Sequence, residues 1–162
     1  MKTIETQCKK AFLASPEIGI LSTKIKNQAL LKMATAIIDN KQKIITSNKI
    51  DLDNGKKNNL SASLLDRLAL TEERLKGIAD SLLTIEKLPD PIGEIMDNWV
   101  RPNGLKISKV RVPLGVVGMI YEARPNVTAD AIGLCVKTGN SVVLRGSSSA
   151  YNSNLAITQV LT

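Results

Sequence analysis

The sequence contains no histidine, few aromatic residues and only two cysteines, and each shortage excludes a kind of chemistry. Without histidine there is no Ser-His-Asp or Cys-His catalysis, no histidine-bound zinc and no histidine-based pH switch. Aromatic residues make up 2% of the chain, too few to stack the bases of single-stranded nucleic acid. Cys8 and Cys135 lie far apart, so we predict no disulfide framework, no metal site and a reducing, cytoplasmic setting.

Long apolar runs are also missing from the sequence. No segment approaches the roughly 20 apolar residues that are needed to cross a bilayer. The N-terminal residues 1–10 are basic but lack the apolar core of a secretory signal. We therefore predict a soluble protein with no membrane partner.

The net charge of +7 is concentrated in residues 1–60, which hold eleven lysines against five acidic residues. Residues 61–162 are nearly balanced, with eleven basic and ten acidic residues. A basic N-terminal third is one signature of a nucleic-acid-binding face. Because acidic and amide residues separate these lysines, we favour a solvated helix surface and predict no nucleic-acid partner.

Helical spacing dominates the first ninety residues. Apolar residues recur at steps of three and four over residues 27–40, which predicts an amphipathic helix with a buried stripe. A second helix is expected from Lys41 to about Asn54, with Gly55 as the residue that ends it. Thr71 is placed to cap a third helix, which the prolines that follow residue 88 would end.

The pattern changes to strands after residue 91. Short apolar stretches flank Pro102-Asn103-Gly104, which predicts a β-hairpin. The wholly apolar run 114–121 predicts a strand that is buried on both faces. A helix over 127–137, with Gly139 as its stop, and a second strand over 141–145 complete a βαβ unit.

These elements predict an α/β fold in three parts. Residues 1–96 would form a helical region, residues 97–112 the hairpin arm, and residues 113–162 the start of a βαβ domain. Two parallel strands leave most sheet edges without partners, and the last helical run stops at Thr162. We therefore expect a truncated α/β domain, the first part of a longer protein.

The carboxyl end of the first βαβ strand carries one candidate site. Ligands of open α/β sheets bind at this end, where Arg124 is placed to hold a phosphate or carboxylate. The Asn126 amide is placed to donate to a developing oxyanion. The structural alternative is that Asn126 or Thr128 only caps the following helix.

The end of the second strand carries another candidate site, Arg145-Gly146-Ser147. A guanidinium, a glycine and a hydroxyl before a helix N-terminus are typical of a phosphate cradle, and a basic residue here accompanies the 2′-phosphate of NADP in dinucleotide folds. A turn followed by an N-cap is the structural alternative. Cys135 lies mid-helix among apolar residues, which predicts inert core and not a nucleophile.

Two segments give the sequence a specific resemblance. The string VPLGVVGMIYEARPNVT over residues 112–128 and the string KTGNSVVLRG over residues 137–146 resemble the glutamate-5-semialdehyde dehydrogenases, also called γ-glutamyl phosphate reductases. Residues 65–71, 89–94 and 99–105 resemble the same family, so the likeness covers nearly the whole chain. The resemblance implies an N-terminal portion of an enzyme in the aldehyde dehydrogenase superfamily, with a Rossmann-like NADP-binding domain.

The family reaction implied is the NADPH-dependent reduction of L-glutamyl 5-phosphate to L-glutamate 5-semialdehyde, with phosphate release, in proline biosynthesis. A cysteine thiolate forms a thioester, which hydride from NADPH reduces. By position, Asn126 resembles the superfamily's oxyanion asparagine, and Arg145, Gly146 and Ser147 stand where relatives bind the cofactor. We assign Arg124 to the acyl phosphate or substrate carboxylate. The hairpin resembles an oligomerisation arm, which implies a homo-oligomer or a contact with glutamate 5-kinase.

The family's nucleophilic cysteine lies in a downstream catalytic domain, and neither Cys8 nor Cys135 matches it. We therefore predict that the 162-residue chain alone is inactive. The alternative is a non-catalytic fragment that interacts with full-length subunits through the arm or through its exposed sheet edge.

Overall fold

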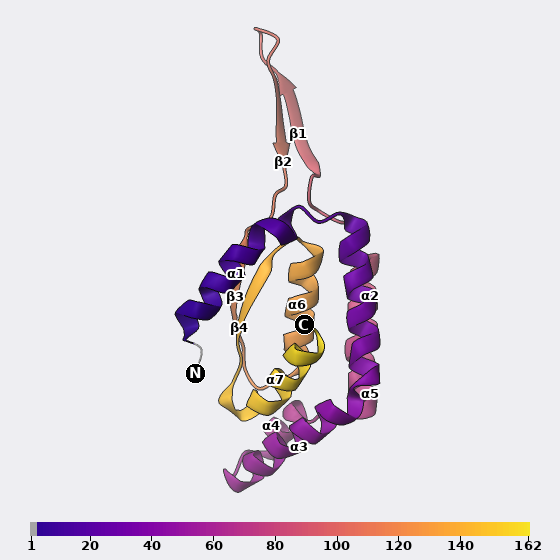
Figure 1. The fold of residues 1–162 in the computed structure, drawn as a ribbon, viewed down its shortest axis with the longest axis vertical. Helices are drawn as coiled ribbons and strands as arrows, with labels where there is room; N and C mark the ends of the chain where they lie inside the picture. Colours follow the sequence, from indigo (N-terminus) through magenta and orange to yellow (C-terminus); the bar gives the residue numbers. More distant parts are fainter. Residues whose placement is uncertain (1–2) are drawn as a thin grey trace.

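Seven α-helices and two small sheets make up the part of the chain that the structure, a computed structural model, describes, residues 3–162. A hairpin projects from a mixed α/β body (Figure 1). In chain order the elements are α1 (Ile4–Gly19), α2 (Thr23–Asp39), α3 (Lys41–Lys57), α4 (Ala62–Leu68), α5 (Glu72–Lys87), β1 (Ile95–Val100), β2 (Lys106–Val110), β3 (Val116–Ile120), α6 (Asn126–Lys137), β4 (Ser141–Arg145), the 3-10 helix η1 (Ser148–Ala150) and α7 (Tyr151–Val160).

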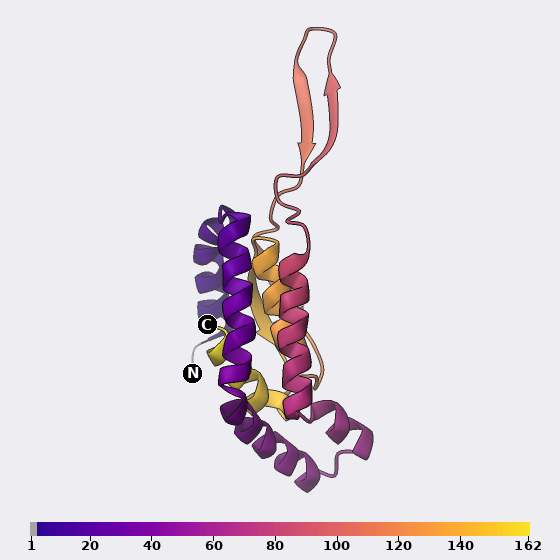
Figure 2. The same ribbon diagram turned by 90° about the vertical axis from the view of Figure 1, so that its right-hand side faces the viewer.

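The apolar core lies where α2, α5 and α6 meet. Leu30 and Ile37 on α2 and Leu75 and Leu82 on α5 are fully buried, which confirms the apolar stripes predicted for these helices. The two helices run side by side along the body (Figure 2). Helix α6 joins them closely because Gly133 has no side chain: a Cβ there would lie 2.7 Å from Leu82 Cδ2.

The ends of α5 and α3 test the predicted helix boundaries. Thr71 caps α5 as predicted, since its Oγ1 accepts a hydrogen bond from Arg74 N at 3.1 Å. The prediction that Gly55 ends α3 is wrong, because α3 continues to Lys57. Gly55 is buried inside the helix, where a Cβ would meet the side chains of Leu60 and Leu65 at 3.0 and 2.9 Å. The glycine therefore serves close packing and not termination.

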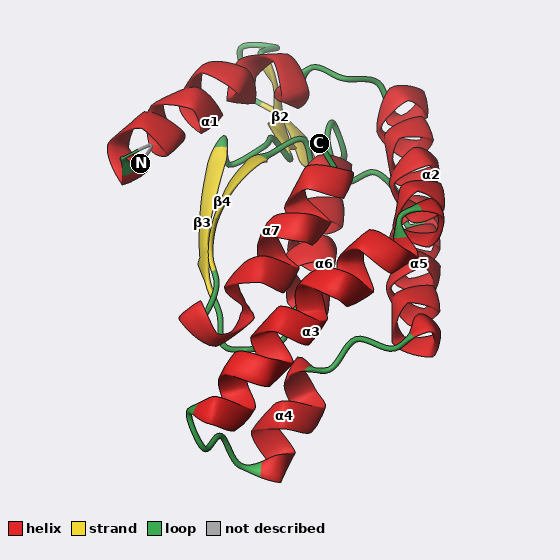
Figure 3. Ribbon diagram, turned by 60° about the horizontal axis from the view of Figure 1, so that its bottom comes forward, coloured by secondary structure: helices red, strands yellow, loops and turns green. Residues whose placement is uncertain are grey.

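The predicted βαβ unit is confirmed. Strands β3 and β4 pair in parallel from Val116↔Ser141 to Ile120↔Arg145, and Gly139 follows α6 with a φ of +67°. The expectation that the first strand is buried on both faces is wrong, because Ile120 is 86% exposed. The strands lie between α1 on one side and α6 and α7 on the other (Figure 3). Each of these strands has a paired neighbour along one edge only.

The predicted hairpin is also confirmed. Strands β1 and β2 pair antiparallel and stand away from the body (Figure 2). Its turn closes with a hydrogen bond from Arg101 N to Leu105 O at 2.9 Å, and Gly104 has a φ of +84° that a glycine adopts without strain. All six residues of β1 are exposed, including apolar Trp99 and Val100.

One lysine of the basic N-terminal third departs from the predicted solvated surface. Lys26 on α2 is 1% exposed and forms an ion pair with Asp90, which also accepts hydrogen bonds from Thr23 and from Ile92 N. Burial by itself raises the pKa of Asp90, but these hydrogen bonds and the Lys26 charge outweigh it and lower the pKa below the usual value. The pair fixes the start of α2 to the chain that leads into the hairpin.

Candidate active-site clefts at the two strand ends

The carboxyl ends of β3 and β4 lie side by side and each leads into a helix. A hydrogen bond from Tyr121 N to Arg145 O, 3.1 Å long, continues the parallel pairing to the end of the sheet. Beyond it, residues 121–125 connect β3 to α6, and residues 146–147 connect β4 to η1 and α7. The two connections open on separate clefts, which we call the α6 cleft and the α7 cleft.

The α6 cleft has a volume of about 530 Å³ and lies between α4, α5 and the start of α6. Arg124 and Asn126, which the sequence places on one candidate site, both line it. Both side chains are exposed. The other lining residues come mostly from α4 and α5: Asp66, Arg67, Ala69, Leu70, Arg74, Gly77, Ile78, Ser81 and Asp130.

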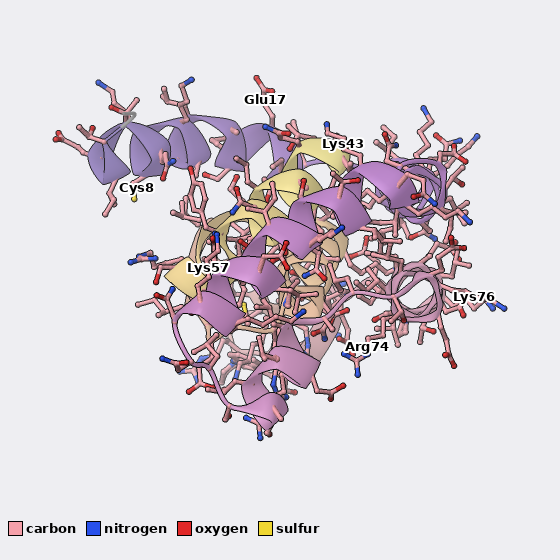
Figure 4. All side chains as sticks on the ribbon, turned by 90° about the horizontal axis from the view of Figure 1, so that it is seen from below. Cys8, Glu17, Lys43, Lys57, Arg74 and Lys76 are labelled. Carbon is pink, nitrogen blue, oxygen red and sulfur yellow. The ribbon has the colours of Figure 1, made fainter. Side chains whose placement is uncertain are left out.

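Arg74 fastens α5 to the end of α4 along one wall of the α6 cleft. Its Nη2 forms an ion pair with Asp66 Oδ1 at 2.8 Å, and its Nη1 donates to the main-chain carbonyls of Asp66 and Ala69. The side chain lies near the junction of α4 and α5 (Figure 4). The charges of Arg74 and Asp66 therefore neutralise each other along this wall of the α6 cleft.

Asn126 starts α6 but does not cap it. No side chain caps this helix, whose first amides, Val127 N and Thr128 N, donate to the carbonyls of Arg124 and Pro125. The alternative that Asn126 acts only as an N-cap is therefore wrong. Its amide nitrogen lies 3.5 Å from Asp130 Oδ2, a long contact that leaves the amide able to donate to a ligand.

Thr128 does not cap α6 either, because it lies within the first turn of the helix and its buried hydroxyl bonds to other elements. Its hydroxyl lies 2.7 Å from the Tyr121 hydroxyl and 3.0 Å from Asn154 Oδ1. Burial raises the pKa of Tyr121, although the hydrogen bond with Thr128 acts in the opposite direction. This network joins the end of β3, helix α6 and helix α7, and two of its residues, Tyr121 and Asn154, line the α7 cleft.

The α7 cleft has a volume of about 550 Å³ and brings Arg145, Gly146 and Ser147 together with the exposed side of α7. Arg145 is exposed, and its Nη1 donates to Gly146 O at 2.7 Å. Ser147 Oγ accepts from Ser149 N at 3.2 Å, so Ser147 does cap η1, as the structural alternative holds.

Gly146 allows the end of β4 to pack closely against α7 at the base of the α7 cleft. A Cβ at this position would clash with Asn154 Nδ2 and would lie 3.1 Å from the Tyr121 ring. Close packing against α7 is therefore a sufficient structural reason for this glycine, independent of any ligand.

The N-terminus of α7 adds no free amides to the predicted phosphate cradle, because a buried carboxylate already binds that helix end. Asp51 of α3, 2% exposed, accepts from Asn152 N and Nδ2 through Oδ1, at 3.2 and 2.8 Å. Its Oδ2 accepts from Ser153 N and Oγ at 2.7 and 2.5 Å. These donors are not free for a phosphate. Asp51 therefore acts as the cap that α7 lacks in its own sequence.

Asn48, one turn before Asp51 on α3, extends this contact toward the α6 cleft. Its Nδ2 donates to Leu68 O and Ser153 Oγ at 2.8 and 3.0 Å, and its Oδ1 accepts from Leu70 N at 2.8 Å. No local motif in the sequence marks Asn48 and Asp51 as functional or structural positions. A signal was present, since both lie at helical spacing from the apolar Ile44 and so belong to the buried face of α3.

Neither cysteine is suited to act as a nucleophile in these clefts. Cys135 is buried in α6, and burial raises the pKa of its thiol, which lowers the thiolate fraction. Cys8 is exposed on α1 and projects on the opposite side of the view from Arg74 (Figure 4). Within residues 3–162 no group of three or more acidic or cysteine side chains is arranged to hold a metal ion. No helix of this part of the chain combines the length and apolar character that a membrane span requires.

Known proteins with similar sequences are gamma-glutamyl phosphate reductases, although no family model matches the chain. The Caldanaerobacter subterraneus protein of that name is 52% identical over 158 residues, which are 98% of this chain and 38% of the relative. The Clostridium beijerinckii protein is 58% identical over 149 residues, 92% of this chain and 36% of the relative. The chain thus spans a little over a third of the length of these curated relatives.

Solved structures of gamma-glutamyl phosphate reductases are also similar to this chain. The gamma-glutamyl phosphate reductase of Thermotoga maritima superposes with a TM-score of 0.92 at 40% identity, covering 94% of this chain and 37% of that one. The Saccharomyces cerevisiae enzyme gives 0.91 at 28% identity, covering 99% and 41%. A Bacillus subtilis protein assigned to the aldehyde dehydrogenases shares the fold, with a TM-score of 0.67 at 19% identity. In sequence and in fold, the chain is similar to the N-terminal portion of the gamma-glutamyl phosphate reductases.

Proposed function

We propose that this chain serves as the N-terminal part of an NADPH-dependent reductase in cytoplasmic proline biosynthesis. The reaction is the reduction of L-glutamyl 5-phosphate to L-glutamate 5-semialdehyde, with release of phosphate. The 52% sequence identity to a relative named for this reduction supports the proposal. The observation that carries it in the structure is Asn126, whose amide faces the α6 cleft at the carboxyl end of β3 without a capping role.

In this proposal the α6 cleft binds the substrate. Attack of a thiolate on the acyl carbon places negative charge on the former carbonyl oxygen, and the Asn126 amide donates a hydrogen bond to that oxygen. Arg124 binds the acyl phosphate or the substrate carboxylate from the same connection. The thiolate comes from the part of the family's sequence that lies beyond the segment matched here.

The α7 cleft binds the cofactor in this proposal. A reductase of the aldehyde dehydrogenase type implies a nicotinamide cofactor, and NADPH, when bound, supplies the hydride. A cleft of about 550 Å³ lies in the size range of nucleotide-binding sites, and its rim carries the exposed guanidinium of Arg145. Arg145 is suited to the 2′-phosphate that distinguishes NADP, while Gly146 and Ser147 shape the wall of the cleft.

The hairpin is proposed to pair this protein with a second copy. Its apolar side chains stand in solvent, with Ile95, Met96 and Val100 more than half exposed. Contiguous exposed apolar surface is typical of interaction sites. A homo-oligomer is therefore proposed, with glutamate 5-kinase as the second candidate for a partner.

The test of the proposed function uses a chimera in which this chain replaces the matching segment of the longer Clostridium beijerinckii relative. Loss of an oxyanion donor typically costs about a hundredfold in the catalytic rate, so Asn126→Ala in the chimera should lower kcat on the order of 10²-fold. NADPH oxidation with L-glutamyl 5-phosphate is the measurement.

Asn126→Ser is the matched control in the chimera. Serine is a good N-cap, but its hydroxyl is shorter than the amide and does not reach the same oxygen. We expect both variants to lose turnover while the melting temperature of each stays close to that of the parent. Turnover that survives in Asn126→Ser and falls in Asn126→Ala only in step with the melting temperature contradicts the oxyanion role.

The 162-residue chain by itself should not catalyse the reaction. Its two cysteines are a buried thiol with a raised pKa and an exposed thiol on α1, and neither lines the two clefts. NADPH-dependent turnover by the purified chain above that of a Cys135→Ala variant would show that Cys135 is a nucleophile. A chimera that never turns over, while the chain binds full-length subunits, would favour the non-catalytic alternative.

A further inference from the structure

The charges that line the α6 cleft do not balance. Three arginines and two aspartates line it. Arg74 and Asp66 neutralise one another through their ion pair. Asp130 accepts hydrogen bonds from Ser81 Oγ at 2.8 Å and, at longer range, from the Asn126 amide. Within residues 3–162, neither Arg67 nor Arg124 forms an ion pair, so the cleft presents two guanidinium groups to whatever enters it.

The two unpaired arginines come from separate elements. Arg67 lies in the last turn of α4, whereas Arg124 lies on the connection from β3 to α6. The backbone of Arg67 is held in place, because Arg74 binds the carbonyls of Asp66 and Ala69 on both sides of it. Arg67 therefore projects from a fixed position, and its planar guanidinium is suited to bind an anion through two parallel hydrogen bonds.

A purely structural role for Arg67 is already filled by another residue. A cation in the last turn of a helix stabilises it by interacting with the terminal carbonyls. In α4 Arg74 donates directly to these carbonyls, and Arg67 makes no side-chain hydrogen bond within residues 3–162. The Arg67 guanidinium is therefore available for a ligand.

We propose that Arg67 is a substrate-binding residue which, opposite Arg124, makes the α6 cleft a site for a ligand with two anionic ends. This inference rests on the proposed function. Asn126 marks the reacting end of the ligand, and Arg124 lies two residues from it, next to the phosphate. Arg67 approaches from α4 and binds the other end, the α-carboxylate of the glutamyl group, in the bidentate manner that guanidinium favours.

The first test measures binding to the 162-residue chain by NMR, with L-glutamate, 4-aminobutyrate and inorganic phosphate as separate probes. 4-Aminobutyrate is glutamate without its α-carboxylate. We expect shifts of the amides in residues 66–70 and 124–130, with L-glutamate binding about tenfold more tightly than 4-aminobutyrate. Arg67→Gln should weaken L-glutamate binding about tenfold and change phosphate binding less than twofold. Arg124→Gln should weaken phosphate binding about tenfold and change L-glutamate binding less than twofold.

Lys76→Gln is the matched control, because it removes the same charge from α5. Lys76 lines the groove between α2 and α5 and points away from the α6 cleft (Figure 4). The Lys76→Gln variant should bind every probe as tightly as the wild type does. The proposal is overturned if L-glutamate does not bind, if Arg67→Gln binds it like the wild type, or if Lys76→Gln weakens binding as much as Arg67→Gln.

A second test uses the chimera and separates this inference from the proposed function. Arg67→Gln should raise the KM for L-glutamate 5-semialdehyde at least tenfold in the phosphate-dependent reverse reaction, with kcat changed less than threefold, and Arg67→Lys should restore part of the KM. An unchanged KM in an active chimera overturns the role of Arg67 but not the proposed function. An inactive chimera whose α6 cleft still binds L-glutamate through Arg67 overturns the proposed function and supports the site.

Discussion

The two strand-to-helix connections of the βαβ unit have the same topology but treat the following helix differently. At α6 no side chain caps the first turn, and the polar side chains of Arg124 and Asn126 face a cleft. At α7 the first amides donate to Asp51, a buried carboxylate supplied by α3. The polar side chains of the first connection are not used to cap its helix, while in the second connection the helix end binds a carboxylate that holds the fold together.

This difference changes what each helix end offers to an anion. A helix N-terminus attracts anions because its amides are unpaired, and a carboxylate that already binds those amides removes the attraction. The cationic group that the α7 cleft offers to an anion is therefore the Arg145 side chain and not the helix N-terminus. In the α6 cleft two arginines and an amide remain available. The sharpest experiments are those that change one connection and leave the other intact.

The largest effect on stability is expected from Asp51→Ala. The substitution leaves the half-buried amide of Asn152 and the buried amide of Ser153 without their acceptor, and such losses cost about 3 kcal/mol in the free energy of unfolding. Urea unfolding of the purified chain measures it. Asp53→Ala, at an exposed position of the same helix, is the control and should cost less than about 0.5 kcal/mol. An Asp51→Ala variant as stable as this control would mean that the carboxylate does not hold α7.

An intermediate effect is expected from Gly146→Ala. The added methyl group would clash with Asn154 Nδ2 and press on the Tyr121 ring, and overpacking of this kind costs about 1–3 kcal/mol. Gly118→Ala is the matched control on β3, where a Cβ would meet no atom within 4 Å. The free energy of unfolding of the Gly146→Ala variant should be lower than that of the Gly118→Ala variant by at least about 1 kcal/mol. Equal stability would show that Asn154 moves aside without cost.

The smallest effect on stability is expected from Asn126→Ala in the 162-residue chain. Asn126 is exposed, caps nothing and has one side-chain contact at 3.5 Å, so the substitution should change the free energy of unfolding by less than about 0.5 kcal/mol. Thr71→Ala is the comparison, because Thr71 does cap a helix and its loss should cost about 1 kcal/mol. A cost for Asn126→Ala as large as that for Thr71→Ala would remove the contrast between the two connections.

Local signals in the sequence predicted much of this fold. The cap at Thr71, the turn around Gly104 and the parallel pairing of 116–120 with 141–145 follow from residues close together in the chain. The grouping of Arg124 with Asn126, and of Arg145 with Gly146 and Ser147, also follows, because each group occupies one short connection.

Contacts between distant segments could not be predicted in this way. Gly55 has the residue type of a helix stop, but Leu60 and Leu65 fold back against it and make it a packing position. Arg67 joins the α6 cleft only because α4 lies across it from Arg124, 57 positions later in the sequence. The spacing of polar and apolar residues carries no information on such tertiary neighbours.

The contact between Asp51 and Ser153 also bears on the order in which the chain folds. Its partners are 102 positions apart, so the chain must close a long loop before the contact can form. During synthesis Asp51 leaves the ribosome long before its partner exists, and its carboxylate stays hydrated until α7 arrives. We expect α2 and α5 to associate first, and the docking of α7 on α3 to complete the two clefts in a late step. Substitutions at Asp51 should therefore speed unfolding more than they slow folding.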